Sequence, residues 1–227
     1  MPRTRIKICG LTRVEDIAAV VAAGADAIGF VFYPKSPRYV TPQQAASLIA
    51  AVPPYVTAVG LFVNATVDEV RATRAVAPLS LLQFHGDETP EHSAALAGAV
   101  NTPFTQVFRV KPDTSFEDLL EYEQRYRAAS PLFASLLLDT YVDAYGGAGK
   151  VFDWSLIPEE LAPRVVLSGG LSVQNATDAV VRVRPYAVDI SSGVEASKGI
   201  KDASRVRAFI AAVQDADAII ARGNHHE

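Results

Sequence analysis

The sequence predicts a protein of the α/β class, built as a single (β/α)8 TIM barrel. Eight short runs of apolar and β-branched residues recur along the 227 residues, each ending near a Gly, Ser, Asp or Asn. Helical patterns lie between them, and strands that alternate with helices pair in parallel through crossovers. Eight such units in a chain of about this length are typical of a closed barrel.

The elements follow one another in order. The expected strands are 6–9, 27–32, 57–63, 81–85, 105–110, 134–139, 164–169 and 187–192. The expected helices are 14–23, 42–51, 67–76, 91–96, 116–127, 173–183 and 203–221. An open doubly wound sheet is the alternative, but it normally carries a glycine-rich turn after its first strand, where only Gly10 stands here. No linker divides the chain, so we expect one domain over 1–227 with a frayed tail from about 222.

Composition and charge exclude several classes of partner. The net charge of -4 and the pI near 5.6 do not favour nucleic-acid binding. No apolar run reaches the ~18 residues of a membrane span, and the N-terminus lacks the apolar run of a signal peptide. One cysteine cannot form an internal disulfide. We therefore expect a cytoplasmic protein without nucleic-acid or membrane partners, and the sequence leaves open whether it is a monomer or a homodimer.

The active site of such a barrel lies at the carboxyl ends of its strands. The residues that the sequence places there are Cys9, 34–38, Asn64, His85, Arg109, Asp139, Gly169, Gly170 and 191–193. Strand alternation puts Cys9 on one face with Lys7, His85 with Gln83, and Ser191 with Asp189. The neighbours Ile8, Phe84 and Ile190 point the other way, so we expect the polar set to face the interior of the barrel.

Two loops indicate a phosphate site. The loops after the seventh and eighth strands read "SGGLS" (168–172) and "SSGVE" (191–195), and loops at these places often bind phosphate through backbone N–H groups. The candidates are Gly169, Gly170, Ser191, Ser192 and Gly193. The alternative for the first loop is a tight turn with Ser172 as the cap of the next helix. A third loop, "GGAGK" (146–150), offers Gly147 and Gly149 and could close over a ligand.

Two groups are candidates for acid–base chemistry. Asp139 ends an apolar strand, where partial desolvation would favour proton donation, but it could equally cap the following loop. The thiol of Cys9 could act as a base or nucleophile if its thiolate is stabilised, or it could be a small buried apolar group. The strand pattern alone leaves both possibilities open for Cys9.

Three other polar residues have expected partners. Arg38 lies in "FYPKSPRYV" (32–40) and could hold a carboxylate, or could be an ordinary surface arginine. Lys7 and Asp189 lie at matching depths of neighbouring strands, which predicts a buried ion pair. His85 could contact the ligand, or could be a core histidine bonded to a backbone carbonyl, which we slightly favour. It is the one histidine of four at a plausible site position, and without a surrounding Cys, His or carboxylate cluster we expect no metal.

The chain as a whole resembles the phosphoribosylanthranilate isomerases of tryptophan biosynthesis. The matching segments are "KICGLTR" (7–13), "GADAIGFVFYPKSPRYV" (24–40), "VGLFVN" (59–64), "LLQFHGDE" (81–88), "LLLDTYVDAYGGAGKVFDW" (137–154), "LSGGLSVQNA" (167–176) and "VDISSGVEASKGIKD" (188–202). They cover nearly the whole chain in the family's order. One departure is Ala148, which stands where the family usually has a Thr or Ser in its glycine loop.

The resemblance implies an Amadori rearrangement of a phosphorylated small-molecule substrate, N-(5-phosphoribosyl)anthranilate, without a cofactor. It implies that Cys9 is the general base, that Asp139 is the general acid and that Arg38 holds the anthranilate carboxylate. Two other readings are weighed against it. The related isomerase of histidine biosynthesis is a similar barrel but uses an aspartate where Cys9 stands, and a non-catalytic phosphate-binding barrel would need neither group.

Overall fold

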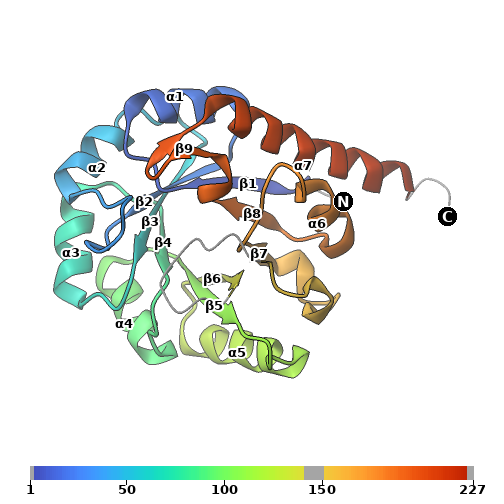
Figure 1. Ribbon diagram of the computed structural model, residues 1–227. Coiled ribbons are helices and arrows are strands. Elements are labelled where there is room, and N and C mark those ends of the chain that lie inside the picture. Colours follow the sequence, from blue (N-terminus) through green and yellow to red (C-terminus); the bar gives the residue numbers. More distant parts are fainter. Residues whose placement is uncertain (1–2, 141–150, 224–227) are drawn as a thin grey trace.

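The barrel is closed. The computed structural model of the protein describes residues 3–140 and 151–223. Eight parallel strands pair in the order β1-β2-β3-β4-β5-β6-β7-β8, and β8 returns to pair with β1 (Figure 1). They are β1 Arg5–Cys9, β2 Ala27–Val31, β3 Thr57–Phe62, β4 Leu81–Phe84, β5 Phe104–Val110, β6 Phe133–Thr140, β7 Val165–Leu167 and β8 Ala187–Ile190. The predicted fold class is confirmed.

Helices surround this barrel. They are α1 Val14–Ala23, α2 Pro42–Ile49, α3 Val67–Val76, α4 Pro90–Val100, α5 Phe116–Ala129, α6 Ala176–Val183 and α7 Ala203–Gly223. Helices α2, α3 and α5 begin at capping boxes, in which Thr41, Thr66 and Ser115 exchange hydrogen bonds with the third helical residue. Helix α7 packs against α1 and α6 and so completes the outer ring. None of the described helices is both long and apolar enough to cross a membrane.

Several elements differ from the prediction, among them α4, which spans Pro90–Val100 rather than 91–96. Helix α6 begins at Ala176, three residues later than expected, because 172–175 form a turn closed by the side chain of Asn175. Between β6 and β7, the described residues form the short 3-10 helices η1 Trp154–Leu156 and η2 Ala162–Arg164. After β8 the chain adds a 3-10 turn, η3 Ser192–Val194, and a small antiparallel pair, β9 Glu195–Ser197 and β10 Ile200–Lys201.

The apolar core has two parts because strand side chains alternate between the faces of the sheet. Ile8, Phe84 and Ile190 belong to the large cluster that includes the buried faces of the helices. Cys9, Val31 and Leu61 form a separate small cluster with Tyr33 and Val63. This division confirms the predicted orientations, since Cys9 does not share the packing of its neighbour Ile8.

Candidate active site

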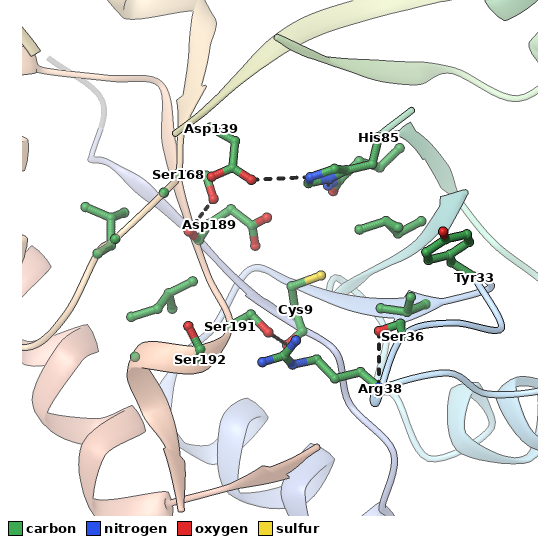
Figure 2. Close-up of a pocket in the computed structure, with 18 of the residues that line it drawn as sticks. Cys9, Tyr33, Ser36, Arg38, His85, Asp139, Ser168, Asp189, Ser191 and Ser192 are labelled. Atoms are coloured by element: carbon green, nitrogen blue, oxygen red, sulfur yellow. Dashed lines mark hydrogen bonds and ion pairs between the residues drawn. The ribbon is translucent and has the colours of Figure 1, made fainter. Parts of the chain in front are cut away.

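A pocket opens at the carboxyl ends of the strands and encloses about 770 Å3 of empty space, part of it open to solvent. Its lining comes from the ends of seven strands, all but β5, and from the loops after them. The lining residues are Cys9, Val31, Tyr33, Ser36, Arg38, Leu61, Val63, Gln83, His85, Asp139, Ser168, Gly169, Gly170, Leu171, Asp189, Ile190, Ser191, Ser192 and Gly193. Figure 2 shows the thiol of Cys9 and the carboxylate of Asp139 pointing into this pocket.

Cys9 is the last residue of β1 and is only 5% exposed. Its carbonyl oxygen accepts a hydrogen bond of 3.0 Å from the Ser191 hydroxyl, which fixes the end of β1 against the loop after β8. Burial raises the pKa of the Cys9 thiol, while the charge of Lys7 beside it acts in the opposite direction. Lys201 also opposes the rise, whereas Asp189 adds to it.

Lys7 and Asp189 form the predicted buried ion pair. They are register partners across β1 and β8, and the Lys7 Nζ lies 2.8 Å from Oδ2 of Asp189. Their side chains are 9% and 6% exposed. Although burial opposes the charged form, Asp189 and the Cys9 sulfur together raise the pKa of Lys7. The neighbouring Asp189 carboxylate thus favours the charged form of the Lys7 amine.

Asp139 is held at the end of β6 by two contacts. Its Oδ1 accepts the backbone N–H of Thr140 at 2.8 Å, and its Oδ2 lies 3.3 Å from Nε2 of His85. The other ring nitrogen of His85, Nδ1, lies 3.1 Å from Nε2 of Gln83. With that amide donating, Nδ1 is the acceptor and Nε2 carries the hydrogen that faces Asp139. The expected bond from His85 to a backbone carbonyl is wrong, because the ring contacts two side chains instead.

Arg38 reaches the pocket from the loop after β2. Its Nε and Nη2 donate to the two carboxylate oxygens of Glu195 at 2.7 and 2.8 Å. Lys201 lies on the same carboxylate, 3.0 Å from Oε1. Burial alone would raise the pKa of Glu195, but hydrogen bonds and charge from Arg38 and Lys201 outweigh it and lower that pKa. The bidentate pair occupies one edge of the guanidinium, so the edge formed by Nη1 remains for a second anion.

The two predicted phosphate loops lie against each other. A side chain at Gly193 would place its Cβ 2.3 Å from the carbonyl oxygen of Leu171, so only glycine permits this contact. The backbone hydrogen bonds of the described residues include none donated by the N–H groups of Gly169, Gly170, Ser192 or Gly193. The alternative in which Ser172 caps the next helix is wrong, since Asn175 holds the cap position and accepts the N–H of Ser172. The loops thus present several backbone donors to the pocket.

Of the residues expected at strand ends, Asn64 and Arg109 lie outside the pocket lining, as do Pro34, Lys35 and Pro37 of the segment 34–38. Asn64 donates its backbone N–H to Glu88 and accepts that of Asp87, and Arg109 pairs with Asp87. Gly147 and Gly149 lie outside the described residues. All the other predicted site residues meet in this one pocket.

Sequence reasoning missed the partners of Arg38. Glu195 and Lys201 stand in "SSGVEASKGIKD" (191–202), where their charges look like those of an ordinary surface loop. In the structure they are 7% and 5% exposed. The signal that could have found them is the chain reversal around Gly199, whose positive φ of 80° fits a tight turn.

Together, the fold and the pocket define a (β/α)8-barrel enzyme for a small anionic substrate, with a thiol and a carboxylate in the same pocket. Among the described residues, no three His, Cys, Asp or Glu side chains gather into a possible metal site.

Comparison with known proteins identifies the family. The family model for N-(5'-phosphoribosyl)anthranilate (PRA) isomerase matches residues 6–212. N-(5'-phosphoribosyl)anthranilate isomerase from Herminiimonas arsenicoxydans is 70% identical over 218 residues, covering 96% of each chain. The chain therefore belongs to the N-(5'-phosphoribosyl)anthranilate isomerase family, and it is an enzyme of tryptophan biosynthesis, as the resemblance predicted.

Solved structures agree. The crystal structure of the isomerase from Thermotoga maritima has a TM-score of 0.81 and 39% identity, and the match covers 93% of this chain and 99% of that one. A second structure of such an isomerase holds reduced 1-(o-carboxyphenylamino)-1-deoxyribulose 5-phosphate. It has a TM-score of 0.78 and 37% identity, with the same coverage.

Proposed function

We propose that this isomerase converts N-(5-phosphoribosyl)anthranilate into 1-(2-carboxyphenylamino)-1-deoxyribulose 5-phosphate with Cys9 as general base and Asp139 as general acid. The observation that carries the proposal is that these two side chains enter one pocket from different strands, β1 and β6. The compound bound to the solved relative, a reduced form of this product, supports the choice of substrate.

The first step opens the ribose ring. Asp139 delivers a proton to the ring oxygen as the bond between that oxygen and C1 breaks. The lone pair of the anthranilate nitrogen forms the new bond to C1, which leaves a protonated imine. The contact with His85 and the N–H of Thr140 fixes the Asp139 carboxyl group for this transfer.

The second step removes the hydrogen on C2. The cationic imine acidifies this hydrogen, and the Cys9 thiolate accepts it while the electron pair forms the double bond between C1 and C2. The resulting enolamine then takes a proton at C1 and loses one from the C2 hydroxyl, which gives the ketone. Burial raises the pKa of Cys9 and so lowers the fraction of the thiol present as thiolate, but the imine acidifies C2 enough for that fraction to serve as the base.

The two ends of the substrate have separate anchors in this proposal. The backbone N–H groups of 169–170 and 192–193, which donate no backbone hydrogen bond within the described part of the chain, receive the phosphate. The open edge of Arg38 receives the anthranilate carboxylate, and His85 and Ser191 line the space between. Anchors at both ends align C1 and C2 with the base and the acid. We also propose the cytoplasm as the compartment, because a reducing environment keeps the single cysteine as a thiol.

Trapping the imine tests the division of roles. Freshly made substrate is mixed with enzyme and quenched with borodeuteride, and fragmentation in the mass spectrometer locates the deuterium, which is on C1 when the open-chain imine is trapped and on C2 when the ketone product is reduced. Cys9→Ala should still open the ring and accumulate trapped amine above the spontaneous background, with little product. Asp139→Asn should yield neither and lose about 10²–10⁴-fold in kcat. Equal trapping by the two variants would show that the roles are not divided in this way.

A further inference from the structure

A buried cation lies directly beneath the thiol. Lys7 precedes Cys9 by two residues on β1, so their side chains share the inner face of the barrel. Although Lys7 Nζ is 2.8 Å from Asp189, neither Nζ nor Oδ1 of Asp189 has an aligned hydrogen-bond partner among the described residues. The Lys7 ammonium is thus more than nine-tenths buried and holds donors that its carboxylate partner does not use.

Gly29 provides the space in which the two side chains meet. It is the register partner of Cys9 on β2. A Cβ at Gly29 would lie 2.7 Å from the sulfur of Cys9 and 3.3 Å from Cε of Lys7. The chain therefore keeps a glycine where any side chain would collide with the Cys9 sulfur and press on Cε of Lys7.

The remaining charges around the thiol do not supply the same contact. The titratable groups that face Cys9 or its pocket are Lys7 on β1, Asp189 on β8, Arg38 and Tyr33 after β2, His85 after β4, Asp139 on β6, Glu195 on β9 and Lys201 on β10. Arg38 and Lys201 share the carboxylate of Glu195, which neutralises much of their charge. Asp139 and His85 face each other. Within the described part of the chain, Lys7 Nζ is a buried cationic nitrogen without an aligned hydrogen-bond partner.

We propose that Lys7 is a positioning residue for the reaction: its buried ammonium, held by Asp189 beneath Cys9, stabilises the thiolate. Gly29 is the second positioning residue, since it keeps open the space between the Cys9 sulfur and the end of the Lys7 side chain. The proposal rests on the proposed role of Cys9 as base. It identifies Lys7 as the residue that favours the thiolate where burial disfavours it.

The test measures the ionisation of Cys9 directly. Cys9 is the only cysteine of the chain, so the rate of alkylation by iodoacetamide against pH follows one thiol. Lys7→Met should raise the midpoint of this curve, and each unit of the rise lowers the thiolate fraction at pH 7 about tenfold. Asp189→Asn should lower the midpoint, because it leaves the charge of Lys7 to the sulfur alone. Opposite shifts from the two halves of one ion pair are not expected of residues that only support packing.

Further variants keep the test decisive. Gly29→Ala should raise the midpoint, whereas Gly98→Ala, at a helix position with nothing within 4 Å, should leave it unchanged. If Lys7→Met does not fold, the double variant with Asp189→Asn removes both charges, and its midpoint should lie above that of the wild type. The proposal would be overturned if Lys7→Met, Asp189→Asn and Gly29→Ala all kept the midpoint of the wild type within experimental error. It would also be overturned if Lys7→Met and Asp189→Asn shifted the midpoint in the same direction.

Measuring turnover distinguishes two claims, that Lys7 stabilises the thiolate and that Cys9 is the base. Lys7→Met should lower kcat at pH 7 with little change in KM, and raising the pH should recover part of the loss. If alkylation shifts as expected but kcat at pH 7 is unaltered, the thiolate contact stands and the assignment of Cys9 as base fails.

Discussion

At the residue scale, Arg38 joins the catalytic end of the barrel to the small β9–β10 pair. Its bond to Glu195 fixes the guanidinium with one edge occupied and one edge available. Gly10 permits this position, because a Cβ there would lie 2.4 Å from Cδ of Arg38. The arrangement suits recognition of a planar carboxylate by a pre-oriented donor group.

The prediction for Arg38→Met is a KM raised about 10-fold or more with a smaller change in kcat. Removing a charged hydrogen bond to the substrate costs roughly 1.5–3 kcal/mol, and a bond kept through the reaction affects binding most. Steady-state kinetics with varied substrate measure this. Arg71→Met, at a side chain that is 58% exposed, is the matched control and should match the wild type. An unchanged KM in Arg38→Met would remove the carboxylate assignment.

Some residue contacts could be predicted and others could not. The pair of Lys7 and Asp189 follows from counting positions along two adjacent strands, since register fixes their depth. The partners of His85 do not follow from such counting, because Asp139 lies two strands away across the interior of the barrel. Contacts across the barrel depend on its diameter and tilt, which no short stretch of sequence encodes.

At the scale of elements, the loop after β7 packs against the end of β6 in addition to its proposed role in binding the ligand. Gly169 has a φ of +79°, and a Cβ there would lie 2.4 Å from the backbone nitrogen of Thr140 and 2.7 Å from Oδ1 of Asp139. The loop therefore presses against the carboxyl group that we propose as the acid.

Gly169→Ala should lower kcat at least 10-fold, because it displaces Asp139, and should lower stability by roughly 1–2 kcal/mol for the left-handed backbone. Gly24→Ala is the matched control, since its φ is +99° but nothing lies within 4 Å of its Cβ. It should lose similar stability in urea unfolding and keep its kcat. Equal kcat values in the two variants would contradict the contact between the loop and Asp139.

Element boundaries were predictable where local chemistry sets them. The helices with capping boxes begin where their Thr or Ser residues indicate. The predicted start of α6 was wrong because a turn over 172–175 precedes the helix. That turn depends on the side chain of Asn175, which bonds to Gly170 and Ser172 rather than to the helix. The β9–β10 pair escaped prediction because its strands have three and two residues, too short for a period-2 pattern.

At the scale of the whole molecule, stability and catalysis lie at opposite ends of the barrel. At the amino end of β1, the backbone N–H and the hydroxyl of Thr4 both donate to the carboxylate of Asp217 on α7, at 2.9 and 2.7 Å. Thr4 is 5% exposed, so this contact fixes the last helix to the first strand within a buried region. The register of β1 with β8 closes the sheet beside it.

Asp217→Ala should therefore lower the free energy of unfolding by about 1–3 kcal/mol, because it leaves two buried donors without a partner. Its kcat and KM at 25 °C should equal those of the wild type, since none of these residues lines the pocket. Urea unfolding and steady-state kinetics on the same preparation measure both quantities. A large loss of kcat in the folded variant would show that the two ends are coupled.

The closed barrel was the most predictable level of the structure. Eight repeated units constrain the fold redundantly, so an error of a few residues in one helix does not alter the pairing order. The single-domain assignment remains a prediction. The chemistry at the pocket could not be predicted from the strand pattern alone. That pattern left open whether Cys9 is a base or a small buried apolar group.

The most direct test of the central claim is kcat of Cys9→Ala in a fluorescence assay with freshly made N-(5-phosphoribosyl)anthranilate. A small change at the edge of a minor apolar cluster should leave the fold and the binding of the reduced product analogue intact. If the thiolate removes the hydrogen on C2, kcat should fall about 10²–10⁴-fold or more. A folded Cys9→Ala variant with normal turnover would contradict the claim that Cys9 is the base.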